Sequence, residues 1–299
     1  ENLKNTTLYV TLEPCTHYGK TPPCVNEIAK HKFGKVFFSI PDIDKKVRNK
    51  SKKILKRRGI IVKDGLLKDK VKNFYQSYKF NRKFKLPYVT GKIAITKNNI
   101  IYSDQTKKIT TLQTDKLSHY LRYKNDSILV SSETINKDNP RLDCRLKGLK
   151  RFSPRRIILD KNLKIKLTSN IVKSINKYNT IIFYNRLSQK KYAYLKKKGA
   201  QLIKTGLDKD KNLNLKKILK TLYTLKSRYI LVEGGAYLTK SFLKMRLFNV
   251  FYLLKSNKKD PMKKNFKVFE SINILEKVFD KKKIIKNILG KDRIIQYNY

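Results

Sequence analysis

Two cysteines in a proline-bearing loop carry the strongest chemical signal in the first part of the sequence. Cys15 and Cys24 follow an apolar, β-rich run and are separated by eight residues that include Pro22 and Pro23. A helix starting near Cys24 would lower the pKa of its thiol, and a thiolate is the form that binds a metal ion. A proline directly before a cysteine, with a second cysteine downstream, matches half of the zinc-deaminase pattern, although the usual gap is shorter. The pair could equally be two unrelated thiols.

Two later segments place polar residues or glycines directly after apolar strands. Residues 127–131 form one such strand, and the polar stretch 132–145 that follows is predicted to be a loop. Residues 229–232 form the other, which runs into Glu233-Gly234-Gly235 and then a helix. Ligands of open α/β sheets lie beyond the carboxyl ends of the strands, and glycines let backbone amides approach a phosphate. Each segment alone is also compatible with an ordinary surface turn.

The elements that would position these residues alternate between strand and helix, which predicts an α/β fold with a parallel sheet. A Lys- and aromatic-rich connector with helical spacing at residues 66–86 separates two regions, so we expect domains at 1–85 and 86–299. In the first region we predict strands at 7–12, 35–40 and 60–62 and helices at 25–31 and 51–58. In the second we predict strands at 88–96, 127–131, 156–159, 180–184, 229–232, 250–254 and 294–297, and helices at 114–123, 188–198 and 215–225.

The charge of the chain is extreme, with 72 Lys and Arg against 22 Asp and Glu in 299 residues, a net charge of +50. Clustered cations bind polyanions, so a nucleic-acid-binding function stays open. Lysine outnumbers arginine by 58 to 14, however, and the excess covers the whole chain. Because nucleic-acid interfaces favour arginine, a general lysine bias is the better explanation. Either way, the positive field would attract small phosphorylated substrates.

Composition excludes several classes of protein. Apolar residues make up 40% of the chain, which is too many for a disordered protein, and the apolar runs are too short for a membrane span. Three cysteines are too few for a disulfide scaffold, so we expect a protein of the reducing cytoplasm. The chain starts at Glu1, and we expect that it begins inside a longer protein.

The cysteine loop, with its Thr-Pro-Pro-Cys ending, resembles the zinc loop of the bifunctional riboflavin-biosynthesis deaminase/reductase family. The resemblance implies that Cys15 and Cys24 are two of three zinc ligands. The third ligand in that family is the His of a His-Ala-Glu motif, whose Glu moves the protons, and no His-x-Glu occurs in this sequence. Since Zn²⁺ needs three protein ligands and the water needs a base, we expect no deamination by this chain as given.

The later segments resemble the reductase domain of the same family. The matching runs are Thr-x-x-x-Asp-Asn-Pro-x-Leu-x-x-Arg from Thr134 and Val-Glu-Gly-Gly from Val232. The resemblance implies the C-terminal part of a cytidine-deaminase-like domain followed by a dihydrofolate-reductase-like domain. The latter would use NADPH to reduce 5-amino-6-(5-phosphoribosylamino)uracil to its ribitylamino form.

The site residues follow from the same resemblance. NADPH would contact Thr134, Asp138, Glu233, Gly234, Gly235, Ala236 and Leu238. The phosphorylated uracil substrate would contact Thr106, Arg122, Leu142, Arg145 and Glu233. The family also implies a homo-oligomer.

The sequence departs from the family at Thr96-Lys97-Asn98-Asn99, where Ser-Leu-Asp-Gly is usual, and at Lys107-Lys108. Two alternatives remain open. One is a nucleic-acid-binding protein on a deaminase-like scaffold, and the other is a reductase whose deaminase remnant is only structural.

Overall fold

A computed structural model describes residues 3–106, 108–263, 265–285 and 290–299. The chain divides into two compact units, Glu1–Leu86 and Pro87–Tyr299, which are described separately.

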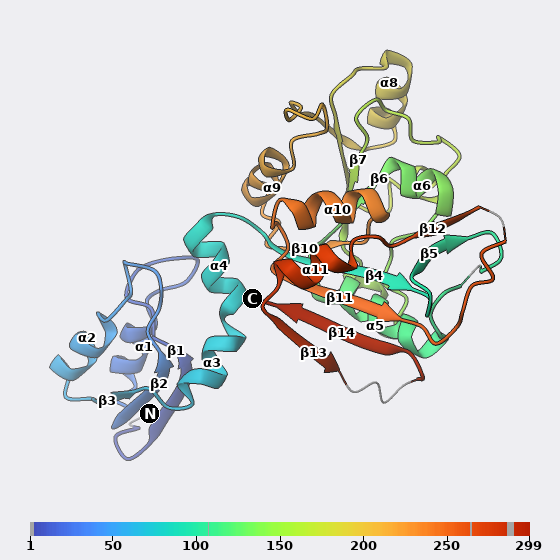
Figure 1. The fold of residues 1–299 in the computed structure, drawn as a ribbon. Helices are drawn as coiled ribbons and strands as arrows, with labels where there is room; N and C mark the ends of the chain where they lie inside the picture. Colours follow the sequence, from blue (N-terminus) through green and yellow to red (C-terminus); the bar gives the residue numbers. More distant parts are fainter. Residues whose placement is uncertain (1–2, 107, 264, 286–289) are drawn as a thin grey trace. The chain divides into compact units, whose positions relative to one another are not determined.

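The first unit is built on a three-stranded parallel sheet in the order β1-β2-β3 (Figure 1). Its core joins Val36 and Phe38 of the middle strand to Val25, Ile28 and Leu55 of the helices, all at most 6% exposed. The described elements are β1 (Thr7–Leu12), α1 (Cys24–Lys30), β2 (Lys35–Ile40), α2 (Ser51–Arg57), β3 (Ile61–Asp64), α3 (Lys68–Phe74) and α4 (Gln76–Phe84).

Glu13 fixes the loop that leaves β1. Its side chain is 3% exposed, and its two oxygens accept hydrogen bonds from the amides of Asp42, Asn49 and Ser51 and from the Ser51 hydroxyl, at 2.9–3.2 Å. Burying a carboxylate is tolerated when its lone pairs are used in this way. Glu13 therefore has a structural role in holding this loop.

The second unit contains a nine-stranded sheet in the described residues, ordered β13-β14-β11-β4-β10-β6-β7-β8-β9 (Figure 1). The pairs β13-β14 and β14-β11 are antiparallel, and the remaining neighbours are parallel. The strands are β4 (Tyr88–Ile95), β6 (Ser127–Ser131), β7 (Arg155–Leu159), β8 (Thr180–Tyr184), β9 (Gln201–Lys204), β10 (Tyr229–Val232), β11 (Val250–Lys255), β13 (Lys281–Ile285) and β14 (Arg293–Asn298). A separate antiparallel pair joins β5 (Ile100–Ser103) to β12 (Phe266–Val268).

Central strands of this sheet are apolar on both faces, as expected for parallel strands that are covered on both sides. Ile128, Val130, Ile158, Ile182 and Leu231 are fully buried in one cluster. The helices of the unit are α5 (Leu112–Lys124), α6 (Ser132–Asp138), α7 (Asn170–Lys173), α8 (Gln189–Lys197), α9 (Leu215–Thr224), α10 (Ala236–Lys244) and α11 (Ile272–Val278), with a 3₁₀ turn at Lys150–Phe152.

The sequence predicted the central elements well and the short or capped ones poorly. The region 132–145 was predicted to be a polar loop, but it opens with helix α6. That helix is capped by the Ser131 hydroxyl, which accepts from the Thr134 amide, and it ends at Asn139 in the left-handed conformation. Helix α11 and strands β5, β12 and β13 were not predicted. In β13 every residue but Ile285 is exposed, so the strand lacks the apolar alternation by which strands are recognised.

Gly91 lies in the middle of β4, where the aromatic rings of β11 and the preceding turn press against the backbone. A Cβ at this position would lie 2.3 Å from Cδ2 of Phe251 and 2.7 Å from Cε1 of Phe248. Gly91→Ala should therefore destabilise the protein by about 1–3 kcal/mol, because packed rings and backbone must shift. Urea unfolding measures the change. Gly206→Ala is the matched control, since its nearest neighbour is a lysine nitrogen at 3.8 Å. Equal stability of the two variants would contradict this account of the strand.

Candidate active site

A cavity of about 860 Å³ lies in the second unit, at the carboxyl ends of three neighbouring strands. Ser131 ends β6, Leu159 ends β7 and Glu233 directly follows β10, and all three line the cavity. This is the place where open parallel sheets bind their ligands. The size is within the range of small-molecule and cofactor sites.

Glu233 is held in the cavity wall by two cations from different elements. Arg122 of α5 donates through Nε to Oε1 and through Nη2 to Oε2, both at 2.9 Å, in a bidentate pair. Lys92 of β4 places its ammonium 3.4 Å from Oε2. The three side chains are only 10–13% exposed. The cluster carries a net charge of +1 and requires α5, β4 and β10 to be correctly arranged.

The cations control the ionisation of Glu233. Burial alone would raise the pKa of this carboxyl, but the charges of Arg122 and Lys92 lower it to about 2. Burial likewise opposes the charge of Arg122, but the Glu233 carboxylate raises the pKa of the guanidinium above its ordinary value. The cavity therefore contains a carboxylate that stays charged at physiological pH.

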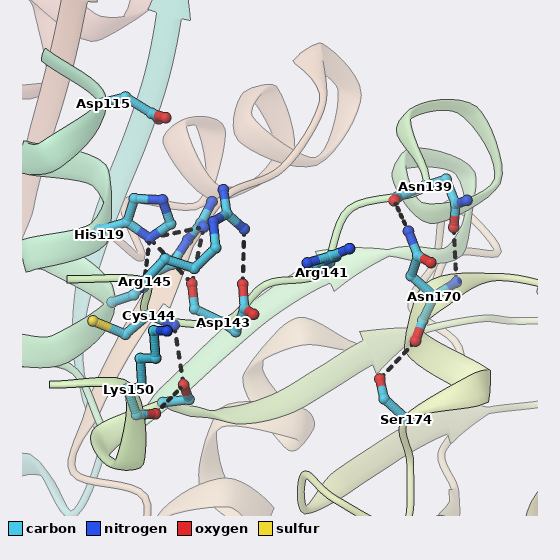
Figure 2. Close-up of polar contacts among 12 residues, drawn as sticks. Asp115, His119, Asn139, Arg141, Asp143, Cys144, Arg145, Lys150, Asn170 and Ser174 are labelled. Atoms are coloured by element: carbon cyan, nitrogen blue, oxygen red, sulfur yellow. Dashed lines mark hydrogen bonds and ion pairs between the residues drawn. The ribbon is translucent and has the colours of Figure 1, made fainter. Parts of the chain in front are cut away.

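His119 contacts both Arg122 and the loop that follows α6, where Figure 2 shows Asp143 and Arg145 beside its ring. Its Nδ1 accepts a hydrogen bond from the backbone amide of Arg145 at 3.2 Å, and Arg122 Nη1 lies 3.5 Å from the same atom. Arg122 Nη1 also donates to the carbonyl oxygen of Asp143 at 3.1 Å. The carbonyl oxygen of Asp143 also lies 3.2 Å from Nδ1, but Arg122 already donates to that oxygen, whereas the Arg145 amide has Nδ1 as its acceptor. We therefore assign the neutral tautomer with its proton on Nε2. Burial, followed by the charges of Arg122 and Arg145, lowers the pKa of His119.

The glycine turn after β10 closes another side of the cavity. Gly235 precedes α10, and a Cβ added to it would meet only the Thr134 hydroxyl, at 3.6 Å. Gly234 is tighter, since a Cβ there would approach the Leu238 side chain to 2.8 Å. The backbone at Gly235 is therefore open toward α6, whereas the backbone at Gly234 is packed against α10.

Nine of the eleven residues expected in the reductase site line this one cavity, namely Arg122, Thr134, Asp138, Leu142, Glu233, Gly234, Gly235, Ala236 and Leu238. Thr106 and Arg145 do not. The Thr106 hydroxyl donates to the Asp260 carboxylate, and Arg145 forms an ion pair with Asp143 at 2.8 Å outside the cavity. Arg122 also differs from expectation, because its guanidinium is occupied by Glu233 and a carbonyl rather than presented to a phosphate.

The two cysteines expected to bind zinc are adjacent, with 3.3 Å between their sulfur atoms. The expected decrease of the Cys24 pKa is wrong: desolvation, then the hydrogen bond with the Cys15 thiol, raise it. No group of three His, Cys, Asp or Glu side chains able to hold a metal ion occurs among the described residues. Two adjacent thiols alone do not complete a zinc site, which needs at least three protein ligands.

Lys92 and His119 are the site residues that sequence reasoning missed. Lys92 interrupts the apolar strand β4, and a lysine in a buried strand is a signal that could have indicated a buried carboxylate partner. His119 lies three residues before Arg122 on the same helix, a spacing that places both on one face. Neither signal alone specifies the partner, which comes from a distant part of the chain.

The comparison with family models matches residues 88–255 to the RibD C-terminal domain. The riboflavin biosynthesis protein RibD of Aquifex aeolicus is 32% identical over 251 residues, which cover 83% of this chain and 68% of that protein. The chain belongs to the RibD family. RibD of Buchnera aphidicola is also 32% identical, over 83% of this chain and 69% of its own length. The chain thus spans about two thirds of the length of these RibD relatives.

Solved structures agree with this assignment to the RibD family. A diaminohydroxyphosphoribosylaminopyrimidine deaminase/5-amino-6-(5-phosphoribosylamino)uracil reductase from Thermotoga maritima is 27% identical, with a TM-score of 0.79 over 100% of this chain and 80% of that chain. A riboflavin biosynthesis reductase from yeast shares the fold, with a TM-score of 0.53 at 21% identity over 76% of this chain and 98% of that chain. The second unit has the dihydrofolate-reductase-like fold of RibD reductase domains. No helix in the described parts of the chain is long and apolar enough to cross a membrane.

Arg122→Ala should destabilise the protein by about 3–5 kcal/mol, because it leaves Glu233 charged and buried without its bidentate partner. Arg145→Ala is the matched control: its pair with Asp143 is 45% exposed on the arginine side and should be worth at most about 1 kcal/mol. Urea unfolding at neutral pH measures both. If Arg122→Ala and Arg145→Ala lost comparable stability, the buried and the exposed ion pair could not differ in strength as described.

The neutral state of His119 predicts a loss of stability in mild acid. Its pKa is lower in the folded protein than in the unfolded chain, so the unfolded chain takes up the proton first. Stability should be complete above the ordinary histidine pKa of about 6.5 and should fall as the pH decreases below it. The free energy of unfolding, measured between about pH 5 and 8, should depend less on pH in His119→Asn than in the wild type. His31→Asn, which removes a histidine side chain that is 43% exposed, is the matched control. A free energy of unfolding of the wild type that increases as the pH falls would contradict the neutral state assigned to His119.

Proposed function

We propose that residues 86–299 form an NADPH-dependent reductase of riboflavin biosynthesis. The substrate is 5-amino-6-(5-phosphoribosylamino)uracil, and the product carries a ribitylamino group. One observation supports the proposal above all others. The segment matched by the RibD C-terminal domain supplies every lining residue of the large cavity except Lys267.

The residues around the cavity fit NADPH. The Gly235 turn leaves its backbone open, and α10 begins at the next residue, so amides at a helix N-terminus are available to a phosphate. Lys161, Lys240 and Lys244 line the same cavity and add positive charge for the phosphates of the cofactor. Thr134 and Asp138 line it from α6.

The chemistry then divides between cofactor and protein. NADPH would supply a hydride to the sugar carbon bonded to the amino nitrogen, while the bond from this carbon to the ring oxygen breaks and the oxygen takes up one proton. The cluster of Lys92, Arg122 and Glu233 has net charge +1, which favours a substrate that carries a phosphate. Glu233 remains an acceptor of hydrogen bonds because it stays ionised. The rigid bidentate pair fixes its orientation and would help to position the uracil portion or the sugar for hydride transfer.

The first unit is proposed to be part of a deaminase-like domain, on the basis of its cysteine loop. Cys15 and Cys24 would be two of the zinc ligands in a complete domain. Because the described residues form no third ligand with them, we assign no deamination step to this chain. The family resemblance also supports a homo-oligomer, which light scattering tests.

The direct test is to follow NADPH oxidation by the purified chain in the presence of the ribosylamino-uracil phosphate. We expect turnover that requires both NADPH and substrate. Glu233→Gln keeps the shape but removes the charge and should lower kcat/KM by about a hundredfold, which corresponds to about 2.7 kcal/mol. No oxidation and no NADPH binding by the folded wild type would reject the proposal.

A second test concerns the glycine turn. Gly235→Val places a branched side chain where the amides must approach the cofactor, and the KM for NADPH should rise by at least about tenfold, equivalent to about 1.4 kcal/mol. Gly206→Val, which lies outside the cavity, is the control. Unchanged NADPH affinity in Gly235→Val would place the cofactor elsewhere.

A further inference from the structure

A second concave site in the reductase unit has an unusually basic lining. It has a volume of about 690 Å³ and shares no lining residue with the large cavity. It lies at the opposite ends of the strands: Asp126 precedes β6, Arg155 begins β7 and Asn179 precedes β8. Its cationic residues are Arg141, Arg145, Lys150, Arg151, Arg155 and Lys177, against two carboxylates, Asp126 and Asp143.

The basic character of this pocket is not simply that of the whole chain. The sequence uses lysine for most of its positive charge and contains only 14 arginines. Four of them line this pocket, and a fifth, Arg156, follows directly after Arg155. Arginine is the residue that binds phosphate bidentately, so its concentration here is a local feature that a lysine bias does not explain.

The two carboxylates of the pocket are already used. Asp143 pairs with Arg145 at 2.8 Å, and Asp126 accepts the amides of Arg228 and Tyr229 at 2.7 and 3.1 Å. Arg155 donates to the carbonyl of Leu225. The other four cations, Arg141, Lys150, Arg151 and Lys177, form no ion pair with any residue that the structure describes. Figure 2 shows the Arg141 side chain extended beside the Arg145–Asp143 pair without a polar contact of its own.

The wall of the pocket is built on a buried arginine. Arg156 is 1% exposed, donates to the carbonyl of Arg141 at 2.6 Å and to the Ser174 hydroxyl at 2.8 Å, and lies 4.1 Å from the centre of the Tyr178 ring. Arg141 and Tyr178 both line the pocket. The Nε of Arg156 is buried without a hydrogen-bond partner in the described residues, and burial lowers the pKa of this guanidinium to about 10. A buried cation without a carboxylate partner is stabilised when an anion binds nearby.

We propose that this pocket binds a small ligand that carries two or more phosphate groups. Four uncompensated cations match the charge of a diphosphate or triphosphate better than that of a single phosphate. The volume exceeds what a bare phosphate needs and leaves room for an attached organic group. A concave site of this size suits a compact ligand rather than a nucleic-acid strand that crosses an open surface.

The pocket is linked to the active site through one segment of chain. Pro140 and Leu142 line the large cavity, while Arg141, Asp143 and Arg145 line the basic pocket. The backbone of this segment turns at Leu142, whose φ of 55° is in the left-handed region, and the segment thus lies between the two cavities. A ligand bound to Arg141 would therefore contact the segment that also contains Arg145, whose backbone amide donates to His119 beside Arg122.

The test is isothermal titration calorimetry of the purified chain with tripolyphosphate, at about 0.15 M salt to screen weak surface attraction. We expect saturable binding of one equivalent, and weaker binding of orthophosphate. The double variant Arg141→Ala, Arg151→Ala should lose at least about tenfold in affinity. The matched control is Lys196→Ala, Lys197→Ala on α8, which removes the same charge away from the pocket and should change affinity by less than about twofold. The side chains of Arg141 and Arg151 make no hydrogen bond in the described structure, so unfolding curves should show both double variants folded.

Three results would overturn the proposal. Equal loss of affinity in the pocket and control variants would show that tripolyphosphate senses only net charge. Absence of saturable binding would show that the pocket holds no such ligand. Tighter binding of a single-stranded RNA oligonucleotide, abolished by the same pocket variants, would assign the cations to nucleic acid instead. None of these outcomes depends on NADPH or on reductase turnover.

Discussion

The buried ion cluster of Arg122, Glu233 and Lys92 is the interaction on which the arrangement of the reductase unit depends. Removing these charges from water is costly, and the cost is offset only when their geometry is good. Both oxygens of Glu233 receive Arg122 at 2.9 Å, which requires α5 to pack at a fixed distance from the end of β10. Lys92 requires β4 to be the neighbour of β10, which the parallel pairing provides. The charge cluster and the order of the strands therefore support each other.

Residues 140–145 connect the apolar core of the reductase unit to the basic pocket. Leu142 is 3% exposed in the apolar core, and the two neighbouring residues are directed to a different cavity from Leu142. His119 fixes the segment from one side and Arg156 from the other, each through a backbone group. Basic side chains in this region thus rest on a rigid backbone, which lowers the entropy lost when they bind an anion.

The sequence predicted the α/β fold because the alternation of strands and helices is a local pattern, whereas the residues around the cavity were expected from the resemblance to the riboflavin-biosynthesis deaminase/reductase family. Apolar runs such as 127–131 and 229–232 identify central strands, and the Val-Glu-Gly-Gly run identifies the turn at a strand end. Helix α6 was missed because its formation depends on a single serine cap within a polar stretch. The role of Arg122 could not be predicted, since its partner lies 111 residues away. Thr106 shows the same limit, because Asp260, which binds it, is 154 residues distant. Long-range pairing of charges is decided by packing and not by local sequence.

The protonation state of Glu233 decides whether the ion cluster exists as described. The carboxyl carbon of this residue can be followed by NMR in protein labelled on glutamate, with Glu233→Gln used to assign the signal. The account predicts a carboxylate that remains ionised at about pH 4, where an ordinary glutamate is more than half protonated. A signal that titrates near the ordinary value of about 4.3 would show that Arg122 and Lys92 do not hold the charge, and the proposed active site would have to be rebuilt without it.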